Sequence, residues 1–406
     1  MDFKLSGAQT PLLTSGLPFS LSFTVSARVH GPLTLAGLQN ALERQRLRHP
    51  LLGVRLAAGG AGTAPCFTTD GVPPIPLRVV ERTGDQDWVG EVEREVPQPG
   101  NYRTGPLFRC VWLRGSDVSD LLLVCDHITA DGRAGMYALR DLLELLARPD
   151  LLPEPLPPTP LAELLPPSTL ARIAELASAD TGPARLAPTR EQEVPPAGPM
   201  RILPFSLEES ETSALVKRCR AEGVTVQAAL CAAFAMPFAE RQPDVPVRLV
   251  ECPVDIRSRL VRSPGETYGN YISLALIRMD CRPGRNPWEV AREAGCGLAA
   301  VTDEQLFTNP LVMTNVSERP ISTPLMDICY DLSISNLGRV DIPEQYGPFQ
   351  LESIYAPTLN VCLPGHRILG VTTFAGRMRC TFASCDPEIP QLLRRACEIL
   401  AAMLRP

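Results

Sequence analysis

His127 is the residue whose type and surroundings best fit acid–base chemistry. The sequence has four histidines, the others being His30, His49 and His366. An apolar run over 121–125 and then Asp126 precede His127, which predicts a buried strand whose end holds the ring at a cleft. Because imidazole titrates near neutral pH, a neutral ring can take a proton from a hydroxyl or amine that attacks a carbonyl carbon.

The residues after His127 complete the spacing His-x-x-x-Asp-Gly. Asp131 is too near the turn to orient the ring, so we expect it to pair with a distant arginine and fix the loop that aims His127. Gly132 is expected to leave space for the approaching substrate, since it has no side chain. The spacing alone does not decide the matter, because a lone buried histidine is more often a hydrogen-bonded core residue than a catalyst.

Composition excludes several other classes of function. The formal charge of −6 and the pI near 5.5 argue against nucleic acid as the main partner. Thirteen cysteines include no C-x-x-C pair, so we expect reduced core cysteines and no metal site. G-x-G-x-x-G, phosphate-loop and G-x-S-x-G patterns are absent from the sequence. No signal peptide and no long apolar run are evident, which predicts a cytoplasmic protein.

Proline marks the expected division of the chain. Fourteen of the 42 prolines fall between Pro149 and Pro204, where they disfavour a long helix or a central strand. We therefore predict an N-terminal lobe over 1–148, a proline-rich crossover over 149–204 with one short helix at 168–178, and a C-terminal lobe over 205–406.

Both lobes are predicted to be mixed α/β. Alternating and periodic apolar residues predict strands at 17–29, 108–113 and 121–125, and helices after Thr34 and after Gly132. In the second half they predict helices at 207–221, 226–239 and 388–404. Strands are predicted there at 247–254, 272–279 and 328–335, with a hairpin at 368–374 and 377–382.

The run His127-Ile128-Thr129-Ala130-Asp131-Gly132 resembles the H-x-x-x-D-G motif of the chloramphenicol-acetyltransferase-like superfamily. That group includes condensation domains of peptide synthetases and acyltransferases associated with polyketides and other secondary metabolism. Further segments resemble its motifs in the same order, and these lie at 5–9, 48–52, 253–257, 268–272 and 331–338. One departure is Asp126, which stands where many members carry a first histidine.

The resemblance implies two lobes with a tunnel between them and His127 as general base. An acyl thioester, carried on coenzyme A or on the phosphopantetheine arm of a carrier protein, would meet a hydroxyl acceptor and form an ester. No tightly bound cofactor is implied, and a monomer is expected. Arg257 is the expected partner of Asp131. Asn336 would either stabilise the developing oxyanion or serve as a turn residue before Gly338.

Two alternatives remain open at this level. The same base could serve an amine, as in a stand-alone condensation enzyme that forms amides. The scaffold could also be a non-catalytic module that docks carrier proteins, although both His127 and Gly132 are present. The acyl chain, the acceptor and the fate of a carboxylate at Asp126 are not predicted.

Overall fold

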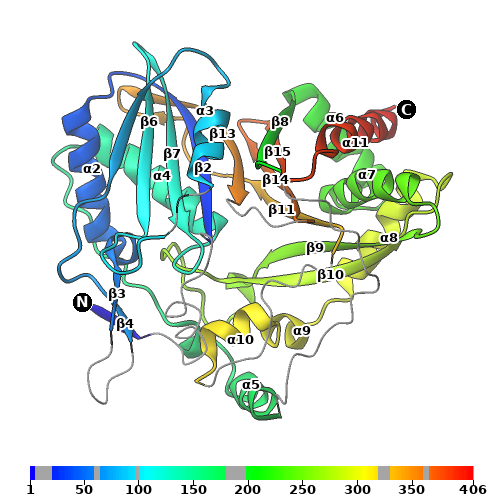
Figure 1. Ribbon diagram of the computed structural model, residues 1–406, viewed down its shortest axis with the longest axis horizontal. Helices are drawn as coiled ribbons and strands as arrows, with labels where there is room; N and C mark the ends of the chain where they lie inside the picture. Colours follow the sequence, from blue (N-terminus) through cyan, green and yellow to red (C-terminus); the bar gives the residue numbers. More distant parts are fainter. Residues whose placement is uncertain are drawn as a thin grey trace.

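The computed structural model describes residues 1–4, 21–58, 65–96, 98, 100–179, 198–318, 330–359 and 365–405. Two six-stranded mixed sheets, each with its own helices, form two lobes side by side (Figure 1). The predicted mixed α/β fold with two lobes is therefore confirmed. The motif at 5–9, the start of the strand expected at 17–29, residues 180–197 of the crossover and the first two residues of 328–335 lie outside the described residues.

The first sheet surrounds the strand that leads to His127. Its order is β12-β13-β2-β7-β6-β5, so the central strand β7 (Val118–Asp126) pairs with both β2 (Ser22–His30) and β6 (Phe108–Arg114). The parallel edge strand is β5 (Leu77–Glu81). Helices α2 (Leu35–Arg48) and α4 (Gly132–Ala147) pack on this sheet, and α3 (Asp87–Glu95) lies near β6 and β7. A three-stranded sheet is formed by β1 (Asp2–Lys4), β4 (Cys66–Thr68) and β3 (Arg55–Ala57).

The second sheet has the order β10-β9-β11-β14-β15-β8. Its strands are β8 (Arg201–Leu207), β9 (Val247–Asp255), β10 (Ile272–Asp280), β11 (Leu332–Arg339), β14 (Arg367–Phe374) and β15 (Arg377–Ser384). Its helices are α6 (Glu209–Ala221), α7 (Val226–Arg241), α8 (Pro287–Ala299) and α11 (Ile389–Leu404). The remaining helices α5 (Pro167–Ala179), α9 (Asp303–Phe307) and α10 (Pro310–Val316) lie below this sheet in Figure 1.

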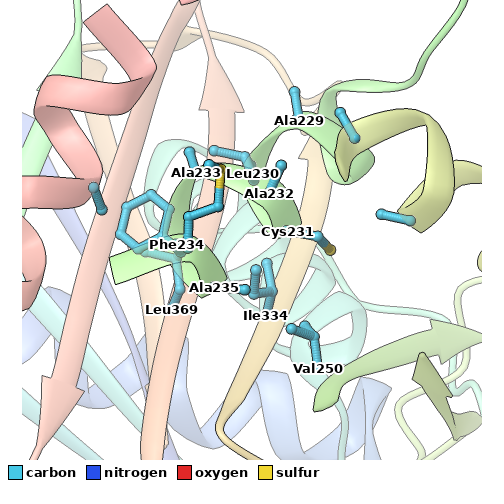
Figure 2. Packing of buried hydrophobic residues seen from close by; sticks show 14 of the residues in the cluster. Ala229, Leu230, Cys231, Ala232, Ala233, Phe234, Ala235, Val250, Ile334 and Leu369 are labelled. Carbon is cyan, nitrogen blue, oxygen red and sulfur yellow. The ribbon is translucent and has the colours of Figure 1, made fainter. Parts of the chain in front are cut away.

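Helix α7 is the centre of the second lobe. Every residue from Ala228 to Ala239 is buried, and small side chains there let the helix approach the sheet closely. Figure 2 shows Phe234 beside Leu369 of β14 and Ala235 beside Ile334 of β11. Thr225 caps the helix, since its hydroxyl accepts a hydrogen bond from the Ala228 amide at 3.1 Å.

Three boundaries differ from the prediction. Strands β12 (Gln345–Tyr346) and β13 (Phe349–Leu359) join the first sheet, because β13 pairs with β2. The expected C-terminal lobe therefore contributes strands to the N-terminal one. Strand β8 begins inside the expected crossover, and Pro204 is tolerated there because β8 is an edge strand. Helix α6 begins at Glu209, and the Glu211 carboxylate accepts a hydrogen bond from the Glu208 amide.

The described residues bear on two expectations, the one about reduced cysteines and the one about long apolar segments. Ten of its cysteines are free thiols, but Cys385 takes part in a disulfide bond, which the expectation of reduced cysteines did not include. Within the same residues, no single helix has the length and apolar character needed to cross a bilayer. Only the bent pair α6 and α7 meets those criteria together.

Candidate active site

His127 directly follows β7, in which every residue except the first is buried. Its backbone amide donates a hydrogen bond to the Leu21 carbonyl at 2.6 Å, so the main chain at this residue is still held by the neighbouring strand. His127 is partly exposed as a residue, and the centroid of its ring lies 5.0 Å from that of the Phe23 ring. The main chain at His127 is therefore fixed by the sheet.

The surroundings of the ring keep it neutral. Burial lowers the pKa of His127 below its usual 6.5, against the charge of Asp131 and hydrogen bonds with the backbone of His127 and Ala130, which act in the opposite direction. A neutral imidazole has one nitrogen that carries a proton and one that can accept a proton. The ring can thus act as a general base at neutral pH.

Asp131 fixes the turn that follows His127. It is fully buried and caps α4, where it accepts a hydrogen bond from the Ala134 amide at 2.9 Å. Its two oxygens also meet the Arg257 guanidinium at 3.0 and 2.9 Å, and one accepts from the Tyr271 amide at 2.8 Å. The ion pair between Asp131 and Arg257 that the sequence predicted is confirmed. Arg257 is buried and joins the two lobes at this point.

A loop of the second lobe, residues 268–271, also holds the main chain of the histidine motif. The Asn270 side-chain amide donates to the His127 carbonyl at 2.7 Å, and the Asp131 amide donates to the Gly269 carbonyl at 3.2 Å. The contact of Asn270 with the His127 carbonyl was not predicted from the sequence. The resemblance of 268–272 to a superfamily motif was the feature that could have pointed to this contact.

Asp126, which stands where the resembled motif often has a first histidine, points into the protein and not toward solvent. Its carboxylate accepts hydrogen bonds from the Tyr102 hydroxyl at 2.9 Å and from the Ile128 amide at 3.0 Å. Burial raises the pKa of Asp126 to about 6, although these two hydrogen bonds oppose the rise. The hydrogen-bond partners of the buried Asp126 carboxylate are therefore a phenol and a backbone amide rather than a cation.

Gly132 has a different neighbour from the one expected. A Cβ at this position would lie 2.9 Å from Cδ2 of Leu337, so the space next to Gly132 is occupied by a side chain of β11 rather than reserved for substrate alone. The glycine lets the second lobe's β11 approach the start of α4.

Asn336 has the hydrogen bond of a turn residue. Its side-chain oxygen accepts from the Gly338 amide at 2.8 Å, next to a register shift in β11, and Gly338 has a φ of +67°. This is one of the two roles that the sequence left open. The role in stabilising an oxyanion stays a prediction.

The other histidines make their polar contacts elsewhere. His49 is buried and its Nε2 lies 2.8 Å from Asp141, while His30 Nε2 lies 2.6 Å from Glu352. His366 is buried in the second lobe, and its carbonyl accepts from the Ser384 hydroxyl. In the part of the chain that the structure describes, no group of three or more His, Cys, Asp or Glu residues could hold a metal ion.

Comparison with known sequences gives two partial matches. Residues 197–355 match the family model described as phthiocerol/phthiodiolone dimycocerosyl transferase C-terminus. A segment of 221 residues, which is 52% of this chain, is 25% identical in sequence to cyclosporin synthetase of Tolypocladium inflatum. The chain spans only 1% of the length of that protein.

Solved structures with the same fold cover nearly the whole chain. Polyketide synthase associated protein 5 from Mycobacterium tuberculosis is 16% identical with a TM-score of 0.65, covering 99% of this chain and 98% of its own. Trichothecene 15-O-acetyltransferase from Fusarium sporotrichioides is 13% identical with a TM-score of 0.71, covering 99% and 94%. The first condensation domain of the CDA synthetase is 16% identical with a TM-score of 0.68, covering 100% and 96%. The chain therefore shares the two-lobed fold of these acyltransferases and condensation domains over nearly its whole length, and its residues 197–355 match the transferase family model.

Proposed function

We propose that this protein is an acyltransferase in which His127 is the general base. It would move an acyl group from a thioester of coenzyme A or of a carrier protein to a hydroxyl acceptor, forming an ester. The observation that carries the proposal is the state of His127, a residue with a neutral imidazole on a turn held from both lobes.

The proposed step needs no covalent enzyme intermediate. His127 takes the proton of the acceptor hydroxyl while the oxygen attacks the thioester carbonyl carbon. The carbon–sulfur bond then breaks, and the imidazolium returns the proton to the departing thiolate. Base catalysis of this kind typically contributes about 10²–10⁴-fold, and the positioning of both substrates lowers the barrier further.

Asp131 and Arg257 act in this proposal as positioning residues. Their ion pair fixes the turn after His127, so removing it would displace the ring without removing the base. Asn336 is the candidate donor to the oxyanion through its amide nitrogen, because its side-chain oxygen is already bonded to Gly338.

Amide formation is the second candidate function. The similarity of half the chain to a cyclosporin synthetase and the condensation-domain fold favour it, since the same base could serve an amine. The ester is preferred because the segment 331–338 resembles that of the polyketide-type acyltransferases.

The test is to follow thiol release from a panel of acyl-coenzyme A and carrier-protein thioesters, with alcohols and amines as acceptors. Acceptor-dependent release should fall about 10²–10⁴-fold in His127→Ala. The matched control is His30→Ala, which removes a histidine that contacts Glu352 and should leave turnover unchanged.

The pH profile gives a second readout. The value of kcat/KM should rise to a plateau with an apparent pKa below 6.5, as expected for a base whose pKa burial has lowered. The preferred acceptor decides between ester and amide. Turnover that survives intact in His127→Ala would contradict the mechanism, and carrier-protein binding without turnover of any thioester would support the docking module instead.

A further inference from the structure

One face of the second sheet points away from the helices of its lobe. In β9, Val250 and Cys252 belong to the apolar core under α7, so Glu251 between them lies on the opposite face. Its cross-strand neighbour on β10 is Leu276, whose relative exposure is 39%. Glu251 is therefore a half-buried carboxylate on a partly open and largely apolar sheet face.

Glu251 also stands where two strands separate. Strand β9 pairs with β11 at two positions only, Leu332 with Val250 and Ser333 with Glu251. The Ser333 hydroxyl donates to Glu251 Oε1 at 3.0 Å, and this is the hydrogen bond of the Glu251 side chain. Beyond this pair the ladder between β9 and β11 ends among the described residues, so Glu251 lies at the last paired position of the two strands.

Glu251 differs from the buried carboxylates of the described residues in the partners that its side chain has. An arginine lies within ion-pair distance of each of Asp120, Asp131, Asp141, Asp331 and Asp386. Asp126 has a phenol and a backbone amide instead. Glu251 has one neutral hydroxyl, and burial raises its pKa to about 7 against the hydrogen bond from Ser333, which lowers it. Among the described residues, no cation lies within ion-pair distance of the Glu251 carboxylate.

The same strand leads from this carboxylate to the motif of His127. Side chains alternate along β11, so Ser333 and Leu337 lie on one face, and Leu337 is the residue that contacts the position of Gly132. Four residues of strand span about 13 Å. Ser333, which bonds to Glu251, therefore lies about 13 Å along β11 from the residue that contacts the start of α4.

We propose that Glu251 and Ser333 form a subsite that recognises a basic nitrogen on the acceptor, remote from its reacting hydroxyl. The proposal rests on the acyltransferase function proposed above and names the class of its acceptor, an alcohol that carries a protonated amine. The ammonium group supplies the positive charge that Glu251 lacks, and the intervening carbon chain runs along the face of β11 from Ser333 to Leu337.

The other charges near Glu251 do not fill this role. Arg278 lies on the same face of β10, opposite Leu249, but it is exposed and forms no ion pair with Glu251. Arg248 is engaged by Asp331 on the other face of β9. Asp255 lies on the face of Glu251, but Arg133 and Arg257 already pair with it.

The test measures binding separately from turnover. The His127→Ala protein would be titrated by calorimetry with ω-(dimethylamino)alkan-1-ols of increasing length and with 1-alkanols of matching length. The tertiary amine is protonated at neutral pH and gives no stable amide. We expect the amino alcohols to bind about 10- to 100-fold more tightly, with an optimum at a span near 13 Å.

Substitution of the carboxylate should remove this preference. Glu251→Gln in the same background should reduce the affinity for amino alcohols about 10- to 100-fold and leave that for 1-alkanols unchanged. Ser333→Ala should have a smaller effect in the same direction, and Glu398→Gln, at an exposed carboxylate of α11, should have none. Equal affinity for the two series, a preference that persists in Glu251→Gln, or no binding by either series would overturn the proposal. A preference in a protein that transfers no acyl group would leave the subsite standing and refute the proposed reaction alone.

Discussion

Asp126 and Asp131 are both buried, and they flank His127 on its two sides, yet their environments are opposite. Asp131 receives the Arg257 guanidinium and two backbone amides. Asp126 receives a phenol and one amide, and burial raises its pKa to about 6. Burial alone therefore does not set the charge of a carboxylate, because the partners decide which protonation state is stable.

The difference matters for the base between them. A negative charge close to an imidazole raises its pKa, which would favour the protonated ring. Arg257 offsets the charge of Asp131, and burial favours the neutral form of Asp126 over part of the pH range. The turn thus carries two carboxylates while the pKa of His127 stays below 6.5.

Removal of the cation from Asp131 should have the largest effect. Arg257→Met leaves a fully buried carboxylate without its ion pair, which should lower the free energy of unfolding by about 3–5 kcal/mol. Acyl transfer should fall as well, since the turn that aims His127 loses its attachment to the second lobe. Urea unfolding measures the first effect and thiol release the second.

Arg259→Met is the matched control, two residues away. Arg259 pairs with Asp303 at the surface, where an ion pair contributes about 0–1 kcal/mol. Asp131→Asn combined with Arg257→Met should recover part of the stability, because it removes the unpaired charge. Equal losses in Arg257→Met and Arg259→Met would show that the buried pair has no special weight.

Neutralising Asp126 should have a smaller effect, opposite in sign and dependent on pH. Below about pH 4 the carboxyl is protonated in both the folded and the unfolded chain and makes no difference. As the pH rises from about 4 to 6, the unfolded chain ionises first, so the folded wild type loses stability. Asp126→Asn should therefore become more stable than wild type across this window, by roughly 2–3 kcal/mol above pH 6.

Thermal or urea unfolding between pH 3.5 and about pH 8 measures this difference. Asp341→Asn is the control, because that carboxylate is 86% exposed and should show no such window. A constant difference between Asp126→Asn and wild type at every pH would mean that the charge of Asp126 is not what destabilises the folded state.

Much of the fold could be predicted because local patterns agree with the final packing. The strand into His127, the hairpin at Ala375 and Gly376 and the helix capped by Thr225 all follow from apolar periodicity and turn residues. The crossing of β13 into the first sheet could not be predicted. It depends on pairing with β2, more than 300 residues earlier in the chain, and nothing in its own residues specifies that partner.

The candidate site likewise has contacts that the sequence predicted and contacts that it did not. Residue type predicted His127, and charge complementarity with a known motif predicted the pair of Asp131 and Arg257. The contacts of Asn270 and Tyr102 were missed, since each depends on the relative placement of distant segments. The contact of Leu337 with the position of Gly132 was also missed, because it follows from how the two lobes pack.

Tyr102→Phe should give the smallest effect and tests the other side of the comparison. The substitution removes one of the two hydrogen bonds to the Asp126 carboxylate, which favour its ionised form. The pKa of Asp126 should rise above about 6 by under one unit, since one such bond contributes about 1 kcal/mol. Carboxyl ¹³C chemical shifts of aspartate-labelled protein measure this value directly. Tyr137→Phe, on α4 beside Arg140, is the matched control and should leave it unchanged. An unchanged pKa in Tyr102→Phe would mean that the Ile128 amide alone sets the state of Asp126, and that the phenol only fills space.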